Sequence, residues 1–186
     1  FQFFERTEHK AAEQISATGP IVICDRVWNS GNIGQIIRIC CNVDCAALYI
    51  VRDPARIYSR NYNILKLAAQ GRVFWEEGKG RFVDRVEDLE ALLPANRTIL
   101  GVETAHGARD LFSMELCPTS SEQSLCLVFG NEKDGISAPL LQMCDSLVFV
   151  PCPGRMKSLN VSACVAVVLF EWLRQSQCNI GRSQAF

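Results

Sequence analysis

The sequence has no long hydrophobic run and no excess of charge of either sign. Its longest apolar stretch is Val161–Phe170, whereas a membrane-spanning helix needs about 20 residues. We therefore predict no membrane association. The 186 residues carry 19 Lys and Arg against 20 Asp and Glu, a net charge of −1. Because this balance excludes a global positive field, nucleic-acid binding would require a local basic patch or a second subunit.

The ten cysteines lack the spacing of a zinc site and of a secreted disulfide framework. Five of them lie inside apolar runs: Cys24, Cys40, Cys45, Cys126 and Cys164. The one cluster, Cys40–Cys45, contains no C-x-x-C pair. We interpret them as small buried hydrophobic residues in a reducing cytoplasm. The prediction is a cytoplasmic protein without a metal.

A hydrophobic content of 48% and a charged content of 21% are typical of a folded globular chain. We predict a single domain over 1–186, with its core at about 20–176. The first residue is Phe and not Met, so we also expect missing N-terminal sequence, with room for an RNA-binding extension.

Short apolar runs alternate with stretches of helical periodicity, which predicts an α/β fold with a parallel sheet covered on both faces. The expected strands are 20–25, 47–51, 72–75, 98–103, 124–130 and 146–151, and the expected helices are 34–43, 60–71, 86–95 and 158–175.

Three stretches carry polar residues where a strand ends or a helix begins. In the first, Asn29–Cys40, a turn rich in Gly and Asn leads into a helix and could hold an anion, although it lacks G-x-G-x-x-G. Arg38 lies in the otherwise apolar helix that follows. It either reaches solvent or binds an anionic partner such as RNA phosphate.

The second stretch, Gly130–Ile136, follows a buried strand. Glu132 is either a site residue beyond the carboxyl end of that strand or the first-turn acid of a helix. The third, Val150–Ser162, opens the last helix. Ser158 or Ser162 could cap this helix, whereas Asn160 is placed inside its first turn and is harder to explain as a cap.

Together the three stretches resemble the SPOUT superfamily, specifically the SpoU/TrmH-type RNA ribose 2′-O-methyltransferases. The first matches N-x-G-N-x-G-x-I-x-R, the second G-x-E-x-x-G-I and the third P-x-x-G-x-x-x-S-L-N-x-S. The order of three motifs is specific, although each alone is weak. The departures are mild: the family's frequent "RTAD" is "RICC" here, and Val150 replaces Ile.

The resemblance implies a deep trefoil knot in the C-terminal part, a homodimer, and S-adenosylmethionine as the cofactor. The cofactor would lie against three loops. The residues implied for it are Gly130, Val150, Leu159, Glu103, Thr104 and Pro151.

The resemblance also implies methyl transfer to a ribose 2′-hydroxyl of tRNA or rRNA, with catalytic residues Asn32, Arg38, Glu132, Ser158 and Asn160. A guanidinium is a poor base, so we expect Arg38 to hold a phosphate and steer the hydroxyl. We expect Ser158 and Asn160 to orient the ribose and Arg38, and Glu132 to organise loops by accepting backbone N–H bonds.

Residues 52–72 carry five basic residues against Asp53, together with Tyr58 and Tyr62. This segment is either an ordinary solvated helix face or an RNA-binding patch. The predicted RNA-binding residues are Arg52, Arg56, Arg60, Arg155 and Lys157.

Two other functions remain possible from the sequence. A non-catalytic RNA-binding or assembly protein could keep this fold, but the intact catalytic positions argue against it. A nucleotide-binding protein of the Rossmann type is disfavoured because G-x-G-x-x-G is absent.

Overall fold

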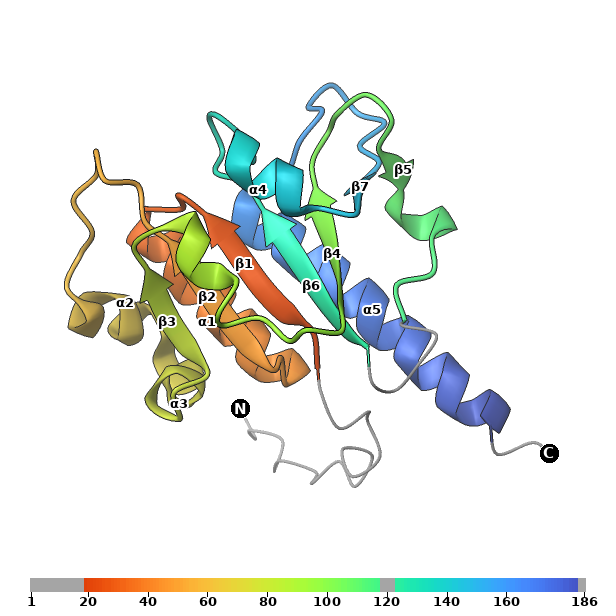
Figure 1. Ribbon diagram of the computed structural model, residues 1–186. Helices are drawn as coiled ribbons and strands as arrows, with labels where there is room; N and C mark the ends of the chain where they lie inside the picture. The colour runs from red at the N-terminus through yellow and green to blue at the C-terminus, as the bar shows by residue number, and fades with distance from the viewer. Residues whose placement is uncertain (1–18, 118–122, 184–186) are drawn as a thin grey trace.

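A seven-stranded parallel sheet organises the computed structural model, which describes residues 19–117 and 123–183 (Figure 1). The strand order is β3-β2-β1-β6-β4-β7-β5. The strands are β1 (Ile21–Asp25), β2 (Ala47–Val51), β3 (Gly80–Val83), β4 (Arg97–Val102), β5 (Arg109–Asp110), β6 (Ser124–Phe129) and β7 (Ser146–Phe149). Every pair of neighbouring strands is parallel.

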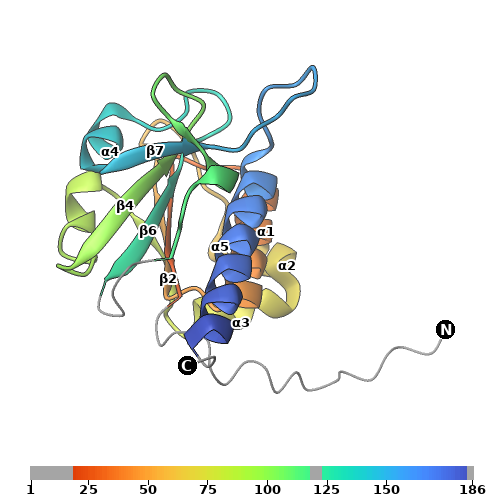
Figure 2. The ribbon, with the colours of Figure 1, turned by 90° about the vertical axis from the view of Figure 1, so that its right-hand side faces the viewer.

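Helices cover both faces of the sheet. The α-helices are α1 (Ser30–Val43), α2 (Asn61–Ala68), α3 (Arg72–Glu76), α4 (Ala138–Met143) and α5 (Val161–Ser183), and the 3₁₀ helices are η2 (Ala69–Gly71), η3 (Val86–Leu89) and η4 (Leu111–Ser113). Helices α1, α2, α3 and α5 lie on one face, and α4 lies on the other (Figure 2).

Strand β1 shows why the apolar runs form this arrangement. All five of its residues are buried. Val22 and Cys24 belong to one hydrophobic core, and Ile21 and Ile23 belong to a second. Because successive side chains of a strand point to opposite faces, a continuous apolar run requires cover on both sides of the sheet. The predicted α/β class with a covered parallel sheet is confirmed.

Some predicted boundaries are wrong. Residues 72–75 form part of α3 and not a strand, because Arg72–Glu76 continues the helical segment of α2 and η2 with Phe74 buried. Residues 86–95 form only the short η3. The sequence analysis did not predict β3, β5 or α4. Strands β3 and β5 are short. In addition, Gly80 of β3 is a weak strand former, and a Cβ added to it would lie 2.4 Å from Trp75.

Within the described residues, no helix combines the length and hydropathy that a membrane span requires. The expected N-terminal extension before Phe1 lies outside the described residues, so it stays a prediction.

Candidate active site

Four loops meet where the strands end, at the upper edge of the sheet in Figure 1. They follow β1, β6, β4 and β7, which are consecutive neighbours in the sheet. In a parallel sheet, ligands bind beyond the carboxyl ends of the strands. The topology therefore brings the three predicted motifs to one edge, together with the loop that follows β4.

A chain of side-chain hydrogen bonds connects the three motifs. The amide nitrogen of Asn32, on α1, donates to Oε1 of Glu132. The amide of Asn160 donates to Oδ1 of Asn32 over 3.1 Å. In turn, Oδ1 of Asn160 accepts from the backbone N–H and the hydroxyl of Ser162, at 2.9 and 2.7 Å. Three residues predicted to be catalytic are thus in direct contact, although up to 128 positions separate them in sequence.

Asparagine caps fix both helices of this cluster. Asn29 precedes α1, and its Oδ1 accepts the N–H of Asn32 over 3.1 Å. Asn160 precedes α5 and accepts the N–H of Ser162, so it caps that helix. The prediction that placed Asn160 inside the first turn and offered Ser158 as a cap is wrong, because α5 begins at Val161. One amide therefore both caps α5 and contacts Asn32.

A cavity of about 500 Å³ opens beside this cluster. Five of the six predicted cofactor residues line it: Glu103, Thr104, Gly130, Val150 and Leu159. Pro151 is not among the lining residues. Three predicted catalytic residues, Glu132, Ser158 and Asn160, line the cavity as well.

Other lining residues were not predicted: Val102, Phe129, Asn131, Lys133, Gly135, Phe149, Met156, Val161 and Cys164. Many of them flank predicted residues, so the ends of the strands were the signal that could have identified them. Burial raises the pKa of the Cys164 thiol to about 12. The thiol is therefore neutral near pH 7 and is a wall of the cavity instead of a nucleophile.

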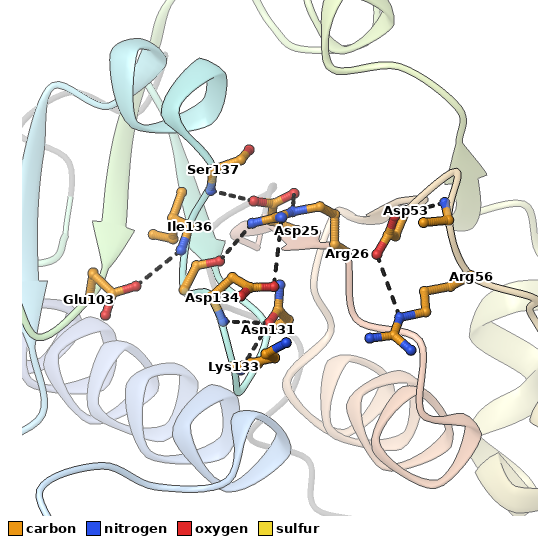
Figure 3. A network of polar contacts seen from close by, with 12 residues as sticks. Asp25, Arg26, Asp53, Arg56, Glu103, Asn131, Lys133, Asp134, Ile136 and Ser137 are labelled. Atoms are coloured by element: carbon orange, nitrogen blue, oxygen red, sulfur yellow. Dashed lines mark hydrogen bonds and ion pairs between the residues drawn. The ribbon is translucent and has the colours of Figure 1, made fainter.

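The second motif forms a tight turn that the carboxylate of Glu103 and the side-chain amide of Asn131 hold in place (Figure 3). Oε2 of Glu103 accepts the N–H of Ile136 over 3.1 Å. Oδ1 of Asn131 accepts the N–H groups of Lys133 and Asp134 at 2.9 and 2.8 Å. The role predicted for Glu132, accepting backbone N–H bonds, thus belongs to its neighbours, and the bond of Glu132 is to the amide of Asn32.

Asp25, at the end of β1, is a fully buried carboxylate that the sequence analysis missed. Its Oδ2 accepts the N–H of Ser137 over 2.6 Å, and Oδ1 lies 3.3 Å from Nε of Arg26. Arg26 also donates to the carbonyl of Gly135 over 3.3 Å (Figure 3). An acidic residue that closes a fully apolar strand was the available signal. These contacts tie the end of β1, which precedes the first motif, to the far end of the second motif.

Arg38 lies apart from the cavity. It is exposed on α1, two turns after Asn32, and is not among the lining residues. Six residues of helix separate the two by about 9 Å along the axis. Ser158 and Asn160 were predicted to orient Arg38. Within the described residues, neither is hydrogen-bonded to Arg38, and Asn160 donates to Asn32 instead.

Acidic neighbours partly neutralise the predicted RNA-binding patch. Arg52 pairs with Asp84 at 2.9 Å, and Arg56 lies 3.8 Å from Asp53. Arg60 is exposed immediately before α2. Arg155 and Lys157 are exposed in the loop before α5, and Lys157 also lines the cavity.

No group of three or more His, Cys, Asp or Glu side chains in residues 19–117 and 123–183 is arranged to hold a metal ion. The nine cysteines whose side chains the structure describes, from Cys24 to Cys164, are free thiols.

Comparison with known proteins identifies the family to which the chain belongs. The model of the SpoU rRNA Methylase family matches residues 19–170. A mouse protein named tRNA (guanosine(18)-2′-O)-methyltransferase TARBP1 is 30% identical over 156 residues, which are 83% of this chain and 9% of the relative. A Streptomyces viridochromogenes protein named 23S rRNA (uridine(2479)-2′-O)-methyltransferase is 32% identical over 161 residues, which are 83% of this chain and 52% of the relative.

The chain thus spans about half of the Streptomyces relative and less than a tenth of the mouse relative. Among solved structures, the SpoU methyltransferase AviRb of S. viridochromogenes, in complex with the cofactor AdoMet, superimposes with a TM-score of 0.68. It is 23% identical, and the match covers 84% of this chain and 57% of that chain. This similarity shows the common fold.

Proposed function

Because the chain belongs to the SpoU rRNA methylase family, we propose that it is an S-adenosylmethionine-dependent methyltransferase that modifies a ribose 2′-hydroxyl of tRNA or rRNA. One observation carries the proposal: Asn32, Glu132 and Asn160, from three separate motifs, are hydrogen-bonded to one another beside the cavity. The names of the relatives, one for tRNA and one for rRNA, support this class of substrate.

The cavity fits the cofactor in size and chemistry. Its volume of about 500 Å³ lies within the range usual for small-ligand sites, about 300–1,000 Å³. Apolar side chains such as Phe129 and Val150 could cover an adenine ring, while Glu103 and Glu132 offer carboxylates to a cationic ligand. The backbone beside Gly130 is closely packed, because an added Cβ would lie 2.2 Å from the carbonyl carbon of Gly135. When bound, S-adenosylmethionine supplies the electrophilic methyl group.

The chain's own residues would then position the acceptor. Asn32 holds Glu132 and Asn160 in fixed relation, so a ribose that contacts either one is oriented with respect to both. Ser158 lines the cavity and is exposed, and we propose that its hydroxyl binds the ribose. Because a guanidinium is a poor base, we do not assign proton removal to Arg38. Its place outside the cavity lining supports a role in holding phosphate, with phosphate or water accepting the proton of the hydroxyl.

Three further features belong to this proposal. A trefoil knot is supported by the strand order, since β7 lies between β4 and β5, which precede it in sequence. A homodimer is supported by two exposed apolar side chains, Phe170 on α5 and Leu159 just before α5, which are 51% and 41% exposed, and light scattering would test it. The single domain over 1–186 and the cytoplasmic location stay predictions, the latter supported by the free thiols.

Calorimetry with S-adenosylmethionine tests the proposal. We expect saturable binding that Gly130→Ala abolishes, because the added methyl group would displace the backbone of Gly135. Gly154→Ala is the matched control, since its Cβ would meet nothing within 4 Å. Absence of binding by the unmodified chain at millimolar cofactor would favour the non-catalytic RNA-binding alternative.

A further inference from the structure

Trp28 is an exposed aromatic side chain on the segment that leads into the first motif. It is 44% exposed, whereas Trp172 is 3% exposed and Trp75 is half-buried. Trp28 directly precedes Asn29, the cap of α1, and lies four residues before Asn32. Four residues span at most about 14 Å, so the indole lies within reach of the nucleotide that would occupy the site or of its neighbours.

One face of the indole is already stacked on a cation. The guanidinium carbon of Arg56 lies 4.9 Å from the centroid of the Trp28 ring. Arg56 also forms an ion pair with Asp53, whose Oδ2 lies 3.8 Å from Nε of Arg56 (Figure 3). Oδ1 of Asp53 also accepts the N–H of Ala55 over 2.9 Å. The guanidinium is therefore fixed against the ring, while the ring keeps nearly half of its surface exposed.

The loop that carries Arg56 is tied to the start of α1. The hydroxyls of Ser30 and Ser59 are 2.8 Å apart, which joins residue 59 to the first residue of the helix. At the base of the loop, the N–H of Asp53 donates to the hydroxyl of Tyr58 over 2.9 Å. Ile57, between them, is 95% exposed. The loop thus presents Arg56 and Ile57 outward on an anchored base, with Arg56 against Trp28.

We infer that Trp28, backed by Arg56, is a stacking platform for an unpaired nucleobase of the RNA substrate, and that it positions the target nucleotide. This inference rests on the proposed function. Unpaired bases of RNA are recognised by stacking on aromatic rings and guanidinium planes. A cation against the opposite face of the indole adds to the attraction of the platform for a polyanion. The platform discriminates an unpaired base from a paired one, because a base within a duplex has no free face.

A structural role is the competing explanation. Trp28 occupies the position before the cap, where an apolar side chain often packs on the fourth helical residue, here the buried Ile33. A ring that served only this packing would be replaceable by leucine without any effect on RNA. The two roles therefore predict different results for the same variant.

The test compares Trp28→Leu and Trp28→Phe with Phe112→Leu. Phe112 is 54% exposed and follows β5 at the opposite edge of the sheet, so it is a matched control. The probes are a fluorescently labelled unstructured RNA 12-mer and an abasic 12-mer with the same phosphates. Affinity is measured by anisotropy over a series of salt concentrations. Tryptophan fluorescence of the unmodified chain is followed in parallel, together with the thermal midpoint and oligomeric state of each variant.

We expect the RNA 12-mer to quench tryptophan fluorescence and to bind the unmodified chain more tightly than the abasic strand. Trp28→Leu should weaken binding of the RNA 12-mer about 5- to 100-fold, remove its advantage over the abasic strand, and leave the salt dependence unchanged because no phosphate contact is lost. Trp28→Phe should retain most of the affinity, and Phe112→Leu all of it.

Unchanged RNA affinity in Trp28→Leu, or equal losses in the leucine and phenylalanine variants, would overturn the inference. So would a change of oligomeric state that accounts for the loss. If Trp28→Leu fails to fold, absence of quenching in the unmodified chain decides against stacking. Cofactor binding by calorimetry is a separate readout: a chain that binds S-adenosylmethionine and methylates RNA without using Trp28 overturns only this inference. A chain that stacks RNA on Trp28 without binding the cofactor overturns only the proposed methyl transfer.

Discussion

At the scale of single residues, the side-chain amide of Asn32 binds two partners, one through its nitrogen and the other through its oxygen. Its nitrogen donates to Glu132, and its oxygen accepts from Asn160. Only an amide offers a donor and an acceptor in this geometry. An unsatisfied polar partner costs about 1–3 kcal/mol, so the identity of this one side chain decides how three motifs are aligned.

We therefore expect Asn32→Asp to lower the rate of methyl transfer about 10- to 100-fold. The new carboxylate would face Glu132, so two negative charges would replace a hydrogen bond. Asn42→Asp is the control, because it adds the same charge at an exposed position of α1. Single-turnover transfer from labelled S-adenosylmethionine to unmodified tRNA measures the effect. Equal rates for the two variants would show that the contact between Asn32 and Glu132 has no role in the reaction.

Gly135 permits the tight turn of the second motif. Its φ is +66°, and an added Cβ would lie 2.3 Å from Oε2 of Glu103, which accepts the N–H of Ile136. Gly107 has a similar φ of +84° but nothing within 4 Å of an added Cβ. Alanine at either position introduces backbone strain, but only alanine at Gly135 also displaces the carboxylate of Glu103. Comparing the two variants therefore separates these two effects.

We expect Gly107→Ala to lower the free energy of unfolding by about 1–2 kcal/mol, the cost of a left-handed alanine. Gly135→Ala should lower it by about 1.5–3 kcal/mol more, since the hydrogen bond between Glu103 and Ile136 is lost as well. Urea unfolding followed by circular dichroism measures both values. A loss in Gly135→Ala no larger than in Gly107→Ala would contradict the role of Glu103.

At the scale of elements, α5 holds the segment before β6 through a polar cluster near its end. The side chain of Gln175 donates to the carbonyl of Met114 over 3.0 Å and accepts the N–H of Leu116 over 2.8 Å. Oε1 of Glu171 accepts from Gln175 and from Arg174 at 2.8 and 2.7 Å. The site at one end of α5 is thus supported by contacts at its other end.

Hydrogen bonding from Arg174, and then from Gln175, lowers the pKa of Glu171 below its usual range. Its contribution to stability is therefore complete above the ordinary glutamate pKa of about 4.3 and is lost as the pH falls through the lowered pKa of the folded state. We expect Glu171→Gln to lower the unfolding free energy by about 1 kcal/mol at pH 7, a modest value because Arg174 is largely exposed.

Thermal unfolding between pH 7 and pH 3 checks this expectation. The difference between the unmodified chain and Glu171→Gln should shrink steadily below about pH 4. A difference that is constant over the whole range would mean that the charge of Glu171 contributes nothing.

Elements also show what the sequence could predict. Strands with continuous apolar runs, such as β1 and β6, were predicted because a strand that is buried on both faces consists almost entirely of apolar residues. The segment Arg72–Glu76 was assigned wrongly, since its valine and aromatic residues favour strands locally while its packing beside α2 makes it helical. Asn160 as a cap was missed because a helix boundary cannot be fixed to within two residues from periodicity.

At the scale of the whole molecule, the family resemblance and the parallel topology together predicted where the motifs meet. Parallel strands share one carboxyl edge, so motifs after β1, β6 and β7 had to converge there. Contacts that depend on side-chain placement could not be predicted, such as Asp25 with Ser137 or Arg56 with Trp28. The neutralisation of Arg52 by Asp84, 32 positions away, likewise required the fold.

The near-neutral charge of the molecule makes RNA binding a matter of local contacts. With a net charge of −1, phosphate attraction cannot come from the chain as a whole. Binding must come from a few exposed cations, such as Lys157 at the cavity and Arg155 in the same loop, and from stacking. The proposed Trp28 platform supplies a contribution that does not depend on net charge.

The most direct test of the proposed function is the chemical position of a transferred methyl group. Unmodified tRNA and rRNA transcripts are incubated with the chain and methyl-labelled S-adenosylmethionine, digested with alkali and analysed for label. We predict label in alkali-resistant dinucleotides, because a methylated 2′-oxygen cannot attack the neighbouring phosphate. In Asn32→Asp this label should form about 10- to 100-fold more slowly. Label in a base, or no label with RNA from any source while the cofactor binds, would contradict ribose methylation by this site.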